Sequence, residues 1–164
     1  MNLSLSKTGD YVVRAALSLA RTPSRTEYRK IREVAAQMNL PPRYTPQILG
    51  MLARAGLAES RAGRDGGYRL TRDAADISLL EVVEAAEGEL RVGRCTLSGG
   101  PCHWEDMCAL HPAWEDATRA FREMLEVATL ADVANVDRHL EAGTQTISET
   151  AHRLAERTRP ERPA

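Results

Sequence analysis

The strongest constraint on the fold of this chain is a glycine-rich, basic hairpin that follows three amphipathic segments. Residues 57–61 and 68–70 have the composition of short strands, and residues 62–67 between them contain three glycines, which favour a tight turn. Upstream, apolar side chains recur at helical spacing over residues 8–20, 29–38 and 43–55. Gly56 is a natural terminator for the third of these helices. Three helices followed by a hairpin is the order of a winged helix-turn-helix domain.

Composition limits what the core can contain. Hydrophobic residues make up 43% of the chain but aromatic residues only 4%, so we expect a core of Ala, Leu, Val, Ile and Met. A fourth amphipathic segment at residues 76–87 would close a winged helix-turn-helix DNA-binding domain spanning residues 1–88. The predicted fold class is mainly α with a small β-wing, with a long dimerisation helix added. The chain has no C-x-x-C motif and no glycine-rich phosphate loop, so we do not expect an enzyme.

Charge is divided unevenly along the chain. Residues 1–75 contain 13 Lys and Arg against 6 Asp and Glu, a net charge of +7. Residues 76–164 contain 9 against 17, a net charge of −8. This division favours a polyanionic partner for the N-terminal half alone, with two differently solvated faces as the alternative. Combined with the winged order, it predicts binding to a double-stranded DNA operator, although winged helices also serve as protein-binding modules.

Two segments of this half are candidates for contact with DNA. The start of the third helix would face the major groove, and the hairpin would bring arginines and a glycine backbone close to phosphate. The candidates in the helix are Arg43, Tyr44, Thr45 and Gln47. The candidates in the hairpin are Arg61, Arg64, Gly66, Gly67 and Tyr68, and Arg69 adds to its positive charge.

All the cysteines of the chain lie in residues 89–111, which we interpret as a cluster-binding loop. The candidate ligands are Cys95, Cys102, Cys108 and His111, in the spacing C-x6-C-x5-C-x2-H. The spacing lacks the paired C-x2-C knuckles usual for zinc and suits a wider iron–sulfur cluster, but zinc and redox-active thiols remain alternatives. We find no secretory signal and no long apolar run, so we expect a cytoplasmic protein without membrane contact, where thiols stay reduced.

Residues 112–142 are expected to hold the dimerisation helix and one further helix. Apolar residues spaced 3, 4, 3 and 4 apart form a heptad seam, namely Trp114, Ala117, Phe121, Met124 and Ala128. Such a seam favours a homodimer, which would also read two DNA half-sites; the alternative is an ordinary core face. Thr129 followed by Asp132 predicts the start of the next helix. Residues 143–164 are expected to form a flexible tail.

Together these motifs resemble the Rrf2 family of winged-helix transcription factors, over residues 2 to about 140. The resemblance rests on residues 5–11 (LSKTGDY), 66–70 (GGYRL), the three-cysteine loop and residues 108–114 (CALHPAW). It implies a dimeric transcriptional regulator, usually a repressor, whose operator binding is controlled by an iron–sulfur cluster. The cluster would sense iron, iron–sulfur supply, nitric oxide or redox state. A zinc-stabilised DNA-binding or interaction module without sensing is the alternative function.

The resemblance leaves the fourth ligand open. Some family members hold a [2Fe–2S] cluster through three cysteines and a histidine that corresponds to His111, and the Cys-x2-His pattern favours this form. In nitric-oxide-sensing members, an Asp corresponding to Asp10 comes from the partner subunit and completes a [4Fe–4S] cluster. Asp10 could equally be a solvated residue of the first helix. Pro46 and Ala62 replace a Glu and an Arg that family members use to choose DNA sites, so their promoter set does not carry over.

Overall fold

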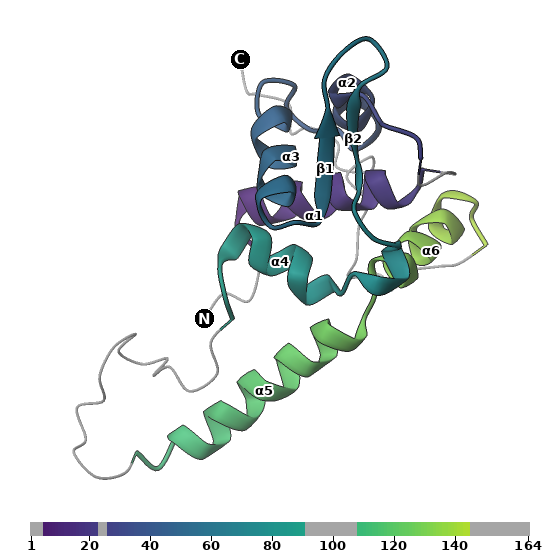
Figure 1. The fold of residues 1–164 in the computed structure, drawn as a ribbon. Coiled ribbons are helices and arrows are strands. Elements are labelled where there is room, and N and C mark those ends of the chain that lie inside the picture. Colours follow the sequence, from purple (N-terminus) through teal and green to yellow (C-terminus); the bar gives the residue numbers. More distant parts are fainter. Residues whose placement is uncertain (1–4, 23–25, 91–107, 145–164) are drawn as a thin grey trace, which may run out of the picture. The chain divides into compact units, whose positions relative to one another are not determined.

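The computed structural model of the chain describes residues 5–22, 26–90 and 108–144. In chain order (Figure 1) its elements are α1 (Lys7–Ala20), α2 (Ile31–Gln37), α3 (Thr45–Arg54), β1 (Ala58–Arg61), β2 (Gly67–Leu70), η1 (Ala74–Asp76), α4 (Leu79–Glu87), α5 (His111–Val127) and α6 (Leu130–Glu141). The mainly helical fold with a two-stranded wing is confirmed. The predicted tail beyond residue 144 and the loop at residues 91–107 lie outside the described residues.

The chain divides into two compact units, Met1–Ala134 and Asn135–Ala164, and the boundary falls within α6. In the first unit, β1 and β2 pair as an antiparallel hairpin in which Ala58 lies opposite Leu70. The aliphatic core that the sequence predicted is also found here. Its buried residues are Val12, Ala15, Ala16, Leu19, Val34, Leu40, Ile48, Leu49, Leu52, Leu57, Ala58, Ile77, Val82 and Leu130. Among the described residues this buried cluster contains no aromatic side chain.

Several helices begin later than the sequence predicts, because the residues before them adopt another backbone structure. The second helix begins at Ile31 and not at residue 29, since Arg29 pairs with Tyr68 of the wing as an isolated β-bridge. The third helix begins at Thr45 because residues 43 and 44 form a turn. The fourth begins at Leu79, after the short 3-10 turn η1 and an extended Ser78. The predicted cap at Thr129 is confirmed, since its Oγ accepts from the Asp132 backbone N–H at 3.1 Å.

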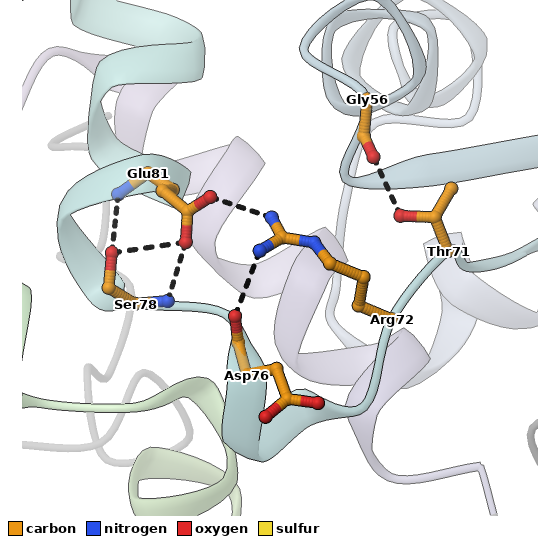
Figure 2. A network of polar contacts seen from close by, with 6 residues as sticks. All are labelled: Gly56, Thr71, Arg72, Asp76, Ser78 and Glu81. Carbon is orange, nitrogen blue, oxygen red and sulfur yellow. Dashed lines mark hydrogen bonds and ion pairs between the residues drawn. The ribbon is translucent and has the colours of Figure 1, made fainter.

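The start of α4 is fixed by a polar network that joins it to Arg72, in the segment that follows β2 (Figure 2). The Ser78 Oγ accepts from the Glu81 N–H at 3.2 Å, and Oε2 of Glu81 accepts from the Ser78 N–H at 2.9 Å. Arg72, which follows β2, donates to Oε1 of Glu81 at 2.6 Å and to the Asp76 carbonyl at 2.9 Å. The reciprocal cap and the ion pair therefore hold α4 against the base of the wing.

This network predicts a pH-dependent contribution to stability. Burial raises the pKa of Glu81, but the hydrogen bonds from Arg72 and Ser78 outweigh it and the net pKa is lowered from its ordinary 4.5. A carboxylate with a lowered folded pKa stabilises the fold above about pH 4.5 and loses that effect as pH falls through the folded value. Glu81→Gln should therefore destabilise by about 0.5 kcal/mol near pH 7, since the pair is partly exposed, and by less near pH 3.

Urea unfolding at a series of pH values measures this difference. Glu126→Gln on α5 is the matched control, because Glu126 is exposed. A difference between wild type and Glu81→Gln that stays constant from neutral to acid pH would contradict the assigned role of the carboxylate.

Candidate nucleic-acid interface and cysteine site

At the start of α3, most but not all of the side chains predicted to contact DNA are exposed to solvent. Arg43, Tyr44 and Gln47 are exposed, with 56% of Tyr44 open to solvent. Thr45 is fully buried, and its Oγ1 donates to the Pro41 carbonyl at 3.0 Å. The structure therefore keeps Thr45 inside the fold, where it fixes the first turn of α3, and leaves its three neighbours to face a partner.

The wing brings its nominated glycines and Arg61 together in one tight hairpin. Arg61 lies opposite Gly67 in the strand register, and its Nη2 donates to the Asp65 carbonyl at 2.9 Å. A Cβ built on Gly66 would lie 2.1 Å from the Arg61 carbonyl oxygen, and one on Gly67 would lie 2.1 Å from the Arg29 carbonyl oxygen. Both glycines are thus required by the packing of the wing itself. Arg64 is exposed beside them, and Tyr68 is half-buried against the core.

Tyr28 was not nominated by the sequence, yet it organises two of the wing arginines. Its ring lies under the guanidinium of Arg61, 4.4 Å from the ring centroid, and under that of Arg69, at 4.6 Å. Arg69 also forms an ion pair with Glu59, and the Tyr28 hydroxyl donates to Glu59 at 3.1 Å. The hydrogen bond from Arg69, followed by that from Tyr28, lowers the pKa of Glu59. Arg69 is therefore neutralised inside the wing.

Arg29 is a second arginine committed to the fold. Its Nη1 donates to Oε1 of Gln37 at 2.6 Å and to the carbonyl of Ser18 at 3.1 Å. Ser18 is fully buried, and its hydroxyl donates to Gln37 at 2.7 Å. The side chain thus ties α1 to α2, while the Arg29 backbone pairs with the wing at Tyr68. Arg29 thus holds three elements together, two through its side chain and the wing through its backbone.

The part of the cysteine site that the structure describes lies at the start of α5. Cys108 is half-buried in a turn, and its carbonyl accepts from the His111 backbone N–H at 3.0 Å. His111 is the first residue of α5, and its Nε2 lies 3.5 Å from a carboxylate oxygen of Glu115. Within the described residues, no three His, Cys, Asp or Glu side chains gather to hold a metal ion. Cys95 and Cys102 lie outside those residues.

Asp10, the other candidate fourth ligand, is engaged by a neighbour on α1. Its two carboxylate oxygens accept from Nε and Nη2 of Arg14 at 2.9 and 2.8 Å. The Asp10 side chain is 44% exposed, so it is not a core residue. Arg14 also reaches toward the Met38 carbonyl at the end of α2, at 3.5 Å. The structure thus gives Asp10 an ion-pair partner and leaves its carboxylate accessible to solvent.

The start of the cysteine loop is fastened to two helices. Leu90 is the last described residue before the loop, and its N–H donates to Oε1 of Glu84 on α4 at 2.9 Å. Nη1 of Arg122 on α5 donates to the same carboxylate at 2.8 Å and to the Leu90 carbonyl at 3.1 Å. We call these three residues the Arg122 clasp. It holds the loop start, α4 and α5 together.

The predicted heptad seam of α5 is exposed in the single chain. Trp114, Phe121 and Met124 are 36, 44 and 70% exposed, and no residue of α5 is buried. The half-buried positions of the helix, such as Thr118 and Arg122, lie on a different face. In the single chain this stripe is therefore not an ordinary core face, which was the alternative interpretation. An exposed apolar stripe of this kind is typical of a surface covered by a partner.

Comparison with known proteins identifies the family. A family model named Rrf2 and described as "Iron-dependent Transcriptional regulator" matches residues 5–136. The chain belongs to the Rrf2 family. It is accordingly a DNA-binding transcriptional regulator and not an enzyme. None of the helices described for this Rrf2 regulator is long and apolar enough to cross a bilayer.

Individual relatives agree with this placement of the Rrf2 chain. The HTH-type transcriptional regulator IscR of Klebsiella pneumoniae is 30% identical over 149 residues, which cover 90% of each chain. The solved structure of CymR, the global cysteine regulator of B. subtilis, has a TM-score of 0.68 at 26% identity and covers 82% of this chain and 98% of its own. The structure of T. potens IscR has a TM-score of 0.65 at 25% identity and covers 92% and 97%.

Sequence reasoning about this Rrf2 regulator missed Tyr28 and the Arg122 clasp. The only available signal for Tyr28 was its place just before a basic run, because its partners Glu59 and Arg61 are about thirty positions away. Arg122 is one of several charged residues on α5, and the spacing of that helix does not set it apart. Both roles depend on contacts between distant segments.

Proposed function

We propose that this Rrf2 regulator is a cytoplasmic homodimeric repressor whose operator binding is controlled by an iron–sulfur cluster held by Cys95, Cys102 and Cys108. The observation that carries the proposal is the position of Cys108, in the turn that opens α5. Helix α5 bears the exposed apolar seam, so a candidate ligand lies directly before the element that carries the expected dimer contact. The iron-dependent description of the family model and the likeness to IscR support this function.

The donor chemistry of the candidate ligands fits such a cluster, although only Cys108, His111 and Asp10 are among the described residues. Three thiolates with an imidazole or a carboxylate are donors that iron–sulfur centres accept, and the cluster would supply iron that reacts with oxidants or nitric oxide. His111 is 47% exposed and lies three residues from Cys108, so the two side chains can share a face of one helical turn. Asp10 would first have to leave Arg14. On this ground we favour His111 and a [2Fe–2S] cluster, with Asp10 and [4Fe–4S] as the competing set.

The contacts of the chain supply a physical link from the cysteine loop to the DNA-binding elements. The Arg122 clasp joins the loop start at Leu90 to α4 and α5. Helix α4 packs on α1, and α1 packs on α3. A change in the loop that releases the clasp would therefore shift α4 relative to α1 and so reorient α3. In a dimer that reads two half-sites, a small shift of both recognition helices changes affinity strongly.

On the DNA side, we assign base contact to the exposed start of α3 and backbone contact to the wing. The exposed side chains lie in the turn before α3 and in its first helical turn, where a helix in the major groove meets base edges. They are Arg43, Tyr44 and Gln47. Arg61 and Arg64 are exposed wing cations that no carboxylate of the described residues neutralises. Gly66 and Gly67 allow the close backbone packing of the hairpin, which would carry the wing to phosphate, and Tyr68 packs against the core.

Ligand variants test this function directly. Wild type purified without oxygen should be coloured and contain iron and acid-labile sulfide, and Cys108→Ala should contain neither, because a missing thiolate leaves the cluster open. His111→Ala should lose or alter the absorption spectrum, while Asp10→Ala should leave it unchanged; the reverse result would name Asp10 as the fourth ligand. DNA binding should differ between wild type and Cys108→Ala.

Two outcomes would contradict the proposal. A colourless wild type with stoichiometric zinc would support the zinc-stabilised module without sensing. A coloured wild type whose DNA affinity equals that of Cys108→Ala would show that the cluster is present but does not control binding. Circular dichroism of each variant serves as the check that the winged domain remains folded.

A further inference from the structure

A cationic groove runs along the wing that no sequence motif indicated. It has a volume of about 550 Å³ and is lined by residues 30–32 and by residues 60–64 and 66–68 of the wing. Its charged lining consists of Lys30, Arg32, Arg61 and Arg64, and it contains no carboxylate. Among the described residues, none of these four cations forms an ion pair. The groove therefore presents uncompensated positive charge to solvent.

The two walls of the groove are held at a fixed separation. The Arg29 N–H donates to the Tyr68 carbonyl at 2.8 Å, and the Tyr68 N–H donates back to the Arg29 carbonyl at 2.9 Å. Lys30 follows this bridge directly, so its backbone is tied to the wing. Gly67 lies against the Arg29 carbonyl, where a Cβ would not fit. The groove is thus preformed and does not depend on a partner to assemble it.

One of the groove cations is also held in position. The guanidinium of Arg61 stacks on the Tyr28 ring at 4.4 Å and donates to the Asp65 carbonyl at 2.9 Å. Neither interaction removes its charge. Arg69, on the same ring, is neutralised by Glu59 and does not line the groove. The wing therefore separates Arg69, whose charge is neutralised within the fold, from Arg61, which keeps its charge and is one of the residues that line the groove.

We propose that this groove binds a phosphate of the DNA backbone, with Lys30 and Arg32 as contacts additional to the wing and the start of α3. The inference rests on the proposed DNA-binding function and extends its footprint to the segment before α2. A duplex is the partner because the groove is open, is walled by backbone and is lined by cations from two separate segments, which suits a continuous phosphodiester chain.

The test uses the whole protein and a mixed-sequence duplex of about 30 base pairs, because phosphate contacts do not depend on sequence. Binding is titrated at several salt concentrations between about 50 and 200 mM. Removing one cation that binds a phosphate should reduce the slope of log K against log salt by about 0.9 and the affinity by about eightfold near 0.1 M salt. We expect these changes for Lys30→Gln and for Arg32→Gln.

Arg54→Gln is the matched control, since it makes the same change at an exposed residue in the last turn of α3, outside the groove. Arg32→Lys should restore most of the slope. Equal slopes for Arg32→Gln, Arg54→Gln and wild type would overturn the groove contact while leaving DNA binding intact. A wild type that fails to bind the duplex would instead overturn DNA binding itself. Saturable binding of inorganic phosphate without any change in the duplex slope would also overturn the inference.

Discussion

Phe121→Asp is expected to convert the protein to monomers at micromolar concentration and to weaken operator binding by roughly 100-fold. Phe121 lies in the middle of the α5 seam and is 44% exposed in the single chain. A carboxylate placed there would have to be buried against the apolar face of a second copy. The free-energy cost of that burial exceeds the stabilisation that the contact provides. The loss of affinity follows because two joined domains reach two half-sites at a high effective concentration.

Sedimentation of wild type and variant measures the oligomeric state, and a footprinted genomic fragment measures operator affinity. Phe121→Leu is the control, since it keeps an apolar side chain at the same position and should remain dimeric. The thermal unfolding of the winged domain should be little changed in both variants, because Phe121 is not part of the buried core. A monomeric wild type, or a Phe121→Asp variant that stays dimeric, would remove the seam as the dimer contact.

Gly67→Ala is expected to destabilise the winged domain by about 3 kcal/mol, one of the larger effects that a single methyl group can have. The added Cβ would lie 2.1 Å from the Arg29 carbonyl oxygen and 2.6 Å from its carbon. Both atoms belong to the backbone of the bridge with Tyr68, so relief requires breaking that bridge. The φ angle of 154° at Gly67 adds a smaller conformational cost for an L-residue.

Gly63→Ala separates the two causes. Gly63 has a φ of 105° in the same hairpin, but no atom lies within 4 Å of a Cβ built there. We expect it to cost about 1 kcal/mol from conformation alone. Urea unfolding of both variants gives the comparison, and the Tm of Gly67→Ala should fall by roughly 6–12 °C. Equal destabilisation of the two variants would show that the close approach to Arg29 has no effect of its own.

For the arginines of the basic half, the sequence does not show which ones are neutralised by ion pairs. Arg61, Arg64 and Arg69 look equivalent in the sequence, but Arg69 is neutralised by Glu59, while the other two pair with no carboxylate of the described residues. Arg29 is bound to Ser18 and Gln37 of two helices, whereas Lys30 beside it lines an open groove. Net charge predicted the kind of partner correctly. Which cations can meet that partner depends on the ion pairs that the fold brings together.

The sequence by itself determined the order of helices and hairpin, the aliphatic core and the spacing of the cysteines. These are local properties, because helical periodicity, caps such as Thr129 and turn glycines act within a few residues. Only the tertiary structure decided that Thr45 is buried, that Tyr28 supports Arg61 and that the α5 seam is open. Burial and ion pairing join residues far apart in the chain, so the packed fold alone decides which side chains remain available for function.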